Sequence, residues 1–221
     1  MSARWRHAGS ALLAASMLLV VGCSDDDSSS AASPESSTTS TTAVTEVPGA
    51  ELVGRWAHYD IVAYEDTLMK TMIVSYGFTD FAVEDGQLIE SEEFCHADQI
   101  SDQPIKTSIS DAATQAIKPV STPVEVSVVA VSLKKKHPGT PTPVGIRLED
   151  PANDPLPSDP NDPRIVDDDG DGNPGITVEI HIGEGPPAEL YLARREIFAY
   201  DLVQTGPDSL SGTVTDSSEQ L

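Results

Sequence analysis

Alternation of apolar and polar residues is the feature that most limits the folds open to this chain of 221 residues. In its clearest example, Ile176 to Ile182, isoleucine or valine stands at every second position with polar residues between them. A period of two places one set of side chains on each face of a β-strand, and hardly any helical period is sustained beyond Gly49. We therefore predict an all-β fold of antiparallel strands, a sandwich or a barrel, with at most one short helix.

The segments that carry this pattern give the predicted strands. Those in the first half form a meander, and they are Leu52 to Tyr59, Leu68 to Phe78, Phe81 to Glu84 and Gln87 to Phe94. Asp85-Gly86 between the last two is a two-residue hairpin turn. Those in the second half are Val124 to Leu133, Ile176 to Ile182, Ala188 to Val203 and Leu210 to Thr215. Val124 to Leu133 is β-branched nearly throughout, which predicts a central strand covered on both faces.

Two further expectations concern single elements of this predicted domain. The only helix candidate is Asp111 to Lys118, with Ser110 as N-cap and Pro119 just after its end. The chain stops soon after the predicted strand from Leu210 to Thr215. This strand is therefore expected to leave an exposed edge or to pair with a neighbour.

The amino terminus has the pattern of a targeting signal. Arg4 and Arg6 precede an apolar run from Ala11 to Gly22 that only Ser16 interrupts, and this run is too short to span a bilayer comfortably. The residues that follow, Leu19 to Cys23, resemble the lipobox of bacterial lipoproteins. The resemblance implies that residues 1–22 are a signal peptide and that Cys23 carries a diacylglyceryl thioether and usually an N-acyl chain. The alternatives are an ordinary signal peptide with an incidental cysteine, or a short uncleaved anchor.

Residues 23–48 are interpreted as the lipid anchor and a disordered linker. Thirteen of the 25 residues from Ser24 to Pro48 are serine or threonine and none is aromatic, so this segment cannot bury enough surface to fold. A flexible chain of this length spans roughly 25 to 30 Å. The predicted domain is then 49–221. By the lipoprotein resemblance, Ser24 rather than Asp after the cysteine favours the outer membrane in a cell with two membranes.

Charge and cysteine content exclude several classes of protein. Lys and Arg number 13 against 36 Asp and Glu, a formal net charge of -23, which repels phosphate backbones and so excludes nucleic-acid binding. Two cysteines are too few for a disulfide framework or a four-thiolate metal site. The run Lys134 to Lys136 is interpreted as a solvated charge run beside the acidic segment that follows it, and the alternative is a salt-sensitive internal partner of that segment.

Residues 134–175 interrupt the strand pattern. These 42 residues hold nine of the 17 prolines and almost no periodicity, and compact domains seldom carry so long a loop without a reason. The segment from Glu149 to Asp171 contains nine carboxylates and a single basic residue, Arg164. Unpaired, so many like charges repel one another. We therefore expect an excursion from the domain that needs a positive ion.

The end of this excursion supplies a candidate site. Asp167 to Gly175 contains D-x-D-x-D-G, in which alternate carboxylates on a tight curve converge on a hard cation. The predicted ligands are the side chains of Asp167, Asp169 and Asp171, the carbonyl of Asn173, and Asp162 or Asp159 to complete the shell. The segment resembles the calcium loops of EF-hand, dockerin and thrombospondin type 3 repeats.

Two departures separate this loop from an EF-hand. Val178 stands where that family needs a bidentate Glu, and no helices flank the loop. The similarity is therefore to a single loop of the thrombospondin type, and it implies structural calcium. The alternatives are a solvated acidic turn, or magnesium or manganese in place of calcium.

A second short motif suggests a ligand pocket. Gly54-Arg55-Trp56 resembles the G-x-W signature of lipocalins. In that family the Trp packs at the closed end of a barrel under a basic side chain, a role that the resemblance gives to Arg194 or Arg195. It also implies an apolar cavity beneath Trp56. The alternative is a core Trp near a strand start, and an aromatic content of 5% leaves little lining for such a cavity.

No set of residues indicates catalysis. The histidines have no H-x-x-x-H spacing, G-x-S-x-G is missing, and the neighbours Cys95 and His96 face opposite ways on a strand. We therefore predict a non-enzymatic, lipid-anchored protein of the bacterial cell envelope, extracytoplasmic, with a calcium-stabilised β domain and a binding or structural role. As a whole it resembles uncharacterised bacterial surface lipoproteins. The alternatives are a lipocalin-like carrier of a small apolar ligand and a metal-dependent hydrolase.

Overall fold

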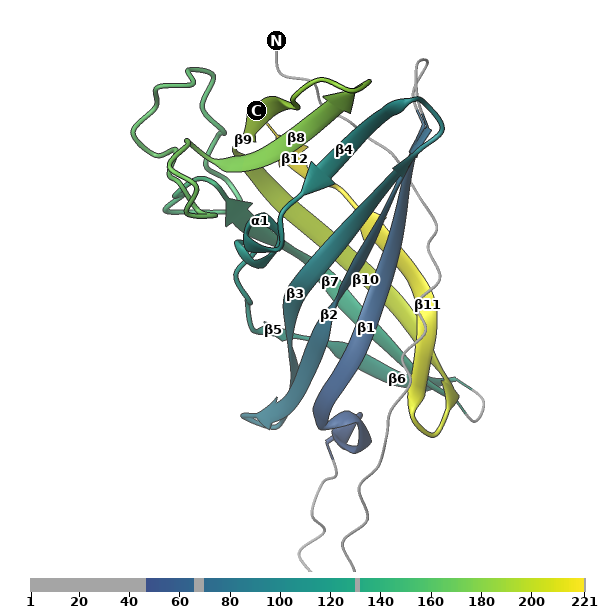
Figure 1. Cartoon of the computed structure of the whole chain (residues 1–221). Coiled ribbons are helices and arrows are strands. Elements are labelled where there is room, and N and C mark those ends of the chain that lie inside the picture. Colours follow the sequence, from purple (N-terminus) through teal and green to yellow (C-terminus); the bar gives the residue numbers. More distant parts are fainter. Residues whose placement is uncertain (1–46, 66–69, 130–131, 221) are drawn as a thin grey trace, which may run out of the picture.

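The computed structural model describes residues 47–65, 70–129 and 132–220 (Figure 1). The predicted signal peptide, Cys23 and nearly all of the predicted linker lie outside these residues. None of the helices in the described part of the chain is long and apolar enough to cross a membrane.

The domain consists of strands in three antiparallel sheets, which confirms the predicted all-β class. The first sheet contains, in spatial order, β1 (Gly54–Glu65), β2 (Lys70–Glu84), β3 (Gln87–Ser101) and β5 (Thr122–Pro123). The second contains β11 (Ser209–Asp216), β10 (Arg194–Gly206), β7 (Ser132–Val144) and β6 (Glu125–Val129), and β12 (Glu219–Gln220) also pairs with β10. The third contains β4 (Ile105–Ile109), β8 (Ile176–Ile182) and β9 (Ala188–Leu192).

The two large sheets face each other as a sandwich, and the third sheet lies at the end opposite the 3-10 turn η1 (Ala50–Leu52) (Figure 1). Alternating side chains fill the interface between the large sheets. Its apolar core consists of Leu52, Trp56, Val62, Phe81, Leu88, Leu133, Tyr200, Leu202, Leu210 and Val214. A second cluster joins the third sheet to the sandwich through Ala113, Ala116, Val144, Ile176, Val178 and Leu192. Burial of each large apolar side chain stabilises the fold by about 1.5–3 kcal/mol.

Local turn and cap signals were predicted correctly. Asp85 and Gly86 have φ of 49° and 77°, the left-handed values that a two-residue hairpin between β2 and β3 requires. The helix α1 (Asp111–Gln115) begins at the predicted residue, and the Ala113 amide donates to Ser110 Oγ over 3.0 Å. The helix ends three residues earlier than expected.

Three predicted segments differ from the observed strands. Val124 to Leu133 is not one central strand, because β6 turns back into β7 within it and Val128 and Val129 are 72% and 59% exposed. The two predicted strands between Leu68 and Glu84 are the single strand β2, and Ala188 to Val203 is divided between two sheets. Alternation fixes which face a residue occupies but not where a β-branched run reverses direction.

The excursion begins at Gly145 rather than at Lys134. Residues 132–144 form β7 in spite of Pro138, Pro141 and Pro143. Beyond Lys136, β7 pairs with β10 only among the strands that the structure describes, so within them this half of β7 has one free edge. Proline lacks an N–H and is tolerated where a strand has such an edge. The predicted strand from Leu210 to Thr215 is part of β11, which pairs with β10 from Phe198 to Gly206 and stands at the end of its sheet.

Candidate metal centre

The acidic loop leaves β7 and returns to β8 through two glycines that lie against the same carbonyl. A Cβ on Gly175 would lie 2.3 Å from the Leu192 carbonyl oxygen, and one on Gly145 would lie 2.6 Å from it. Both residues have positive φ, which favours glycine. The two ends of the loop therefore close tightly at its base, beside the last residue of β9.

Backbone hydrogen bonds hold the two sides of this base together. Val166 N donates to Gly145 O over 3.1 Å, Gly175 N donates to Val166 O over 2.9 Å, and Asp168 N donates to Gly175 O over 3.0 Å. The long segment is therefore an organised loop, and its acidic end has a fixed position relative to β8.

Three predicted ligands come together on this loop. Oxygens of Asp167, Asp169 and Asp171 all lie within 4.8 Å of one another, so the three carboxylates could hold a metal ion. Backbone amides orient each carboxylate: Gly170 and Gly172 donate to Asp167, Thr177 donates to Asp169 over 2.8 Å, and Asn173 donates to Asp171 over 2.8 Å. A carboxylate oxygen that accepts one hydrogen bond keeps a lone pair for a cation.

The electrostatics of the cluster centre on Asp169. Desolvation by burial raises the pKa of this carboxyl, and the neighbouring charges of Asp171 and Asp167 raise it further. One of its oxygens is buried and has no hydrogen-bond partner among the described residues. A cation would favour the ionised form of Asp169 by offsetting both effects.

The structure does not bring Asp162 or Asp159, the side chains predicted to complete the shell, into this cluster. The guanidinium of Arg164 binds both oxygens of Asp162, at 2.9 and 3.0 Å, and its amide donates to the same side chain. Asn173 lies beside the cluster through its bonds to Asp171. Asp159 accepts from the Asn161 amide instead.

Sequence reasoning missed the role of Asp168. Its carboxylate is 5% exposed and takes two bonds from the Arg147 guanidinium, at 2.6 and 3.0 Å, and one from the Gly145 amide at 2.7 Å. Asp168 thus faces the base of the loop, whereas its two neighbours face the cluster. The alternation of the Asp run was the available signal, but Arg147 is 21 residues away in the chain.

The predicted pocket of Trp56, Arg194 and Arg195 is not assembled. Trp56 is buried, donates to Leu52 O over 2.8 Å and packs edge-on against Phe81. Arg194 pairs instead with Glu196 at 2.7 Å, and Arg195 pairs with Glu219 at 3.2 Å. The space beside Trp56 is about 20 Å³. This is room for one water-sized group.

Charged side chains line that space from several strands. Lys135 and Glu90 are each 1% exposed and form an ion pair, and the Lys135 ammonium lies 4.9 Å from the centre of the Phe81 ring. Asp60 accepts from the Tyr200 hydroxyl over 2.7 Å. Because this space is small and its lining includes buried charges as well as apolar side chains, it offers little to an apolar ligand.

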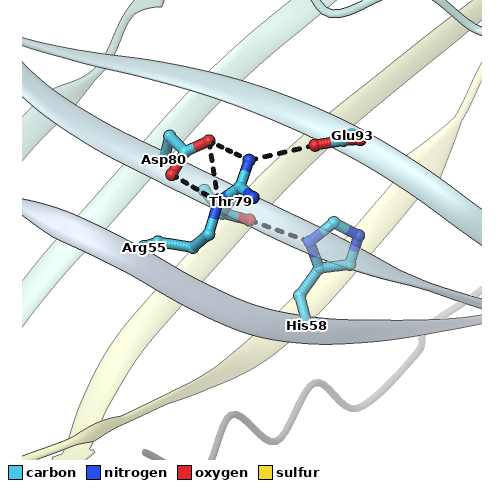
Figure 2. A network of polar contacts seen from close by, with 5 residues as sticks. All are labelled: Arg55, His58, Thr79, Asp80 and Glu93. Atoms are coloured by element: carbon cyan, nitrogen blue, oxygen red, sulfur yellow. Dashed lines mark hydrogen bonds and ion pairs between the residues drawn. The ribbon is translucent and has the colours of Figure 1, made fainter.

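A polar network lies on the first sheet around Arg55, the middle residue of the G-x-W motif (Figure 2). Arg55 on β1 binds Asp80 on β2 at 2.8 Å and Glu93 on β3 at 3.0 Å, and it lies 4.9 Å from the centre of the Phe78 ring. His58 Nδ1 lies 2.9 Å from Thr79 Oγ1 in the same view. The charged side chains are about half exposed, so their ion pairs add little stability.

One surface cluster has the residue types of a nucleophilic triad. Ser108 Oγ lies 3.1 Å from His181 Nε2, and Glu179 Oε2 lies 3.2 Å from the same nitrogen. A triad places the acid on the other ring nitrogen, where it orients the base. The three residues are therefore arranged as a surface hydrogen-bond cluster.

Comparisons of the chain with protein-family models, with curated proteins and with solved structures find no match.

Proposed function

We propose that this protein is a lipid-anchored, extracytoplasmic β-sandwich whose acidic loop binds calcium as a structural ion, and that it serves the cell envelope in binding or structure. The observation that carries the proposal is the convergence of Asp167, Asp169 and Asp171 on one point. The lipobox-like Cys23 supplies the anchor and the location.

The chemistry of the cluster favours calcium over magnesium. Calcium takes six to eight oxygens at flexible angles, whereas magnesium demands a near-ideal octahedron. Asp167 and Asp171 are exposed, so water can complete a loose shell around an ion held by them. Outside the cytoplasm, sites with affinities of about 0.1 to 1 mM can be filled where calcium is plentiful.

The position of the loop supports a structural role for the ion. Asp169 binds the Thr177 amide near the start of β8, and Asp168 binds Arg147 and Gly145 just after β7. An ion in the cluster would remove the repulsion among carboxylates that sit on this junction. It would therefore stabilise the attachment of the third sheet to the sandwich.

No specific observation favours the other two functions. An apolar carrier needs an apolar cavity beneath Trp56, and the space there is about 20 Å³ and lined by Glu90 and Lys135. A hydrolase needs groups beside the ion that can act on a substrate, and the loop carboxylates are held by backbone amides.

Thermal unfolding of the chelator-treated protein tests the calcium proposal. We expect the melting temperature to rise with added calcium, because a ligand that binds only the folded state stabilises it by about 2.7 kcal/mol at one hundred times Kd. Asp169→Asn should abolish this rise. A melting temperature that does not respond to millimolar calcium would contradict the proposal.

Asp168→Asn is the matched control. It should lower the melting temperature at every calcium concentration, because it removes the charge that Arg147 binds, and it should retain the calcium-dependent rise. Equal loss of the rise in both variants would assign the effect to the loop fold rather than to the ion. Magnesium at the same concentrations should give a smaller rise.

A further inference from the structure

The strand β6 is an open edge of the second sheet. It pairs with β7 alone, from Glu125 opposite Lys136 to Val129 opposite Ser132. Within residues 47–65, 70–129 and 132–220, no other backbone hydrogen bond reaches β6. Unpaired N–H and C=O groups along an edge are a template for a further strand.

Two other strand edges of the described domain differ from that of β6. β1 and β11, at one side of the sandwich, lie next to each other. The free half of β7 contains Pro138, Pro141 and Pro143. Prolines and charged residues discourage pairing at an edge, but β6 has no proline, no lysine and no bulge, and Glu125 is its only charge.

β6 also carries valine side chains that are exposed to solvent. Val126 is half-buried against the main core, whereas Val128, on the same face, is 72% exposed. Val129 is 59% exposed on the opposite face. A strand added along this edge would cover part of these side chains.

Local charge allows a second copy of this chain to be the partner. Most of the surface of a chain with a net charge of -23 repels another copy. Around β6, however, Lys134 and Lys136 stand opposite Ser127 and Glu125, and both lysines pair with Asp201. Two positive and two negative charges make this patch neutral, so two copies can approach here.

We propose that β6 pairs antiparallel with β6 of a second copy, with Ser127 opposite Ser127 of that copy. This register places Val126 opposite Val128 and Glu125 opposite Val129, so no two acidic residues face each other. The two second sheets then form one continuous sheet through the axis of a symmetric dimer. A membrane anchor on each copy would raise their local concentration.

Crosslinking of the full chain at the symmetry axis tests this pairing. Directly opposite residues of an antiparallel pair have Cβ atoms about 4.5–5.5 Å apart, so Ser127→Cys should form an intermolecular crosslink with mild oxidant or a short bifunctional thiol reagent. Thr213→Cys, on β11 of the same sheet and exposed like Ser127, is the matched control. We expect dimer on a non-reducing gel from the first variant at least tenfold faster than from the second.

A charge on the same edge distinguishes pairing from chance contact. Val128→Asp in the Ser127→Cys chain should abolish the crosslink with an unchanged melting temperature, because Val128 is exposed within one copy. Val129→Asp repeats the test on the other face. Equal crosslinking at positions 127 and 213, or crosslinking that survives both charges, would overturn the proposal. A monomeric mass in detergent with a shielded thiol at position 127 would also overturn it and would assign the edge to residues 1–46 of the same chain.

Discussion

Single residues between the two large sheets have their acidity changed by burial. Asp60 is 3% exposed, and desolvation raises its pKa to about 7. The hydrogen bond from Tyr200 and the charge of Lys135 lower this pKa, but by less. His58, 6% exposed, has its pKa lowered to about 4, first by desolvation and then by Lys135. Burial also raises the pKa of Glu92, where Glu90 and Asp60 add their repulsion.

These shifts act in opposite directions on stability. A raised carboxyl pKa means that the folded state holds the Asp60 proton more tightly than the unfolded state does. The contribution of Asp60 to the free energy of unfolding is therefore full below pH 4 and is lost as the pH rises to about 7. The lowered pKa of His58 gives a contribution that is full above about pH 6.5 and is lost as the pH falls to about 4. The contributions of Asp60 and His58 to the free energy of unfolding therefore largely oppose each other in the wild type.

Asp60→Asn should leave the contribution of His58 to the pH dependence of stability without the opposing contribution of Asp60. Asn still accepts from the Tyr200 hydroxyl but does not ionise, so the variant should gain stability relative to the wild type between pH 4 and pH 7. The gain is up to about 4 kcal/mol at about 1.4 kcal/mol for each pKa unit. Urea unfolding at several pH values measures it, with the exposed Glu184→Gln as control. A constant difference across this range would contradict the assignment.

Sequence could not identify these buried charges. Lys134 to Lys136 was interpreted as a solvated run, and this interpretation is wrong for Lys135, which is 1% exposed. Alternation does place Lys135 on the same face of β7 as Leu133 and His137. Its partner Glu90 is far away in the chain, so only the packing of the two sheets reveals the pair.

At the level of elements, close approach between strands depends on glycine. Gly77 lies beside a register shift between β2 and β3, and a Cβ there would be 2.0 Å from the Glu93 carbonyl oxygen. A side chain would have to push the strands apart. No sequence pattern showed this constraint, because the segment was divided into two strands near this residue.

Gly77→Ala should therefore destabilise the domain by about 1–3 kcal/mol, the cost of overpacking a tight site. Gly185→Ala is the matched control, because no atom lies within 4 Å of a Cβ there and its φ is not positive. It should change the free energy of unfolding by less than about 0.5 kcal/mol. Equal urea midpoints for the two variants would show that β2 and β3 separate at no cost.

Local signals predicted elements better than they predicted their partners. The Asp85-Gly86 turn, the Ser110 cap and the convergence of Asp167, Asp169 and Asp171 depend on residues within a few positions, and all three are present. Sheet membership depends on distant segments, and here the predictions failed for residues 124–133 and 188–203. The same distinction explains why Asp168 and Arg147 were not paired in advance.

On the scale of the whole molecule, the proposed attachment to the membrane must overcome the repulsion between the acidic domain and anionic lipids. A net charge of -23 repels anionic headgroups, so the domain surface does not favour binding to such a bilayer. Each buried methylene of an acyl chain contributes about 0.8 kcal/mol, and one chain alone gives only reversible binding. The two or three chains that the lipobox resemblance implies for Cys23 would hold the protein permanently.

Cys23→Ala should release the protein from the membrane fraction of a host that processes lipoproteins, and should move it from the detergent-rich to the aqueous phase on detergent phase separation. The calcium-dependent rise in melting temperature should persist, because the loop carboxylates belong to the folded domain and Cys23 precedes it. Cys95→Ala, at the half-buried free cysteine, is the matched control and should stay with the membrane. If the Cys23 variant also stays there, the apolar run from Ala11 to Gly22 is an uncleaved anchor and the lipobox assignment fails.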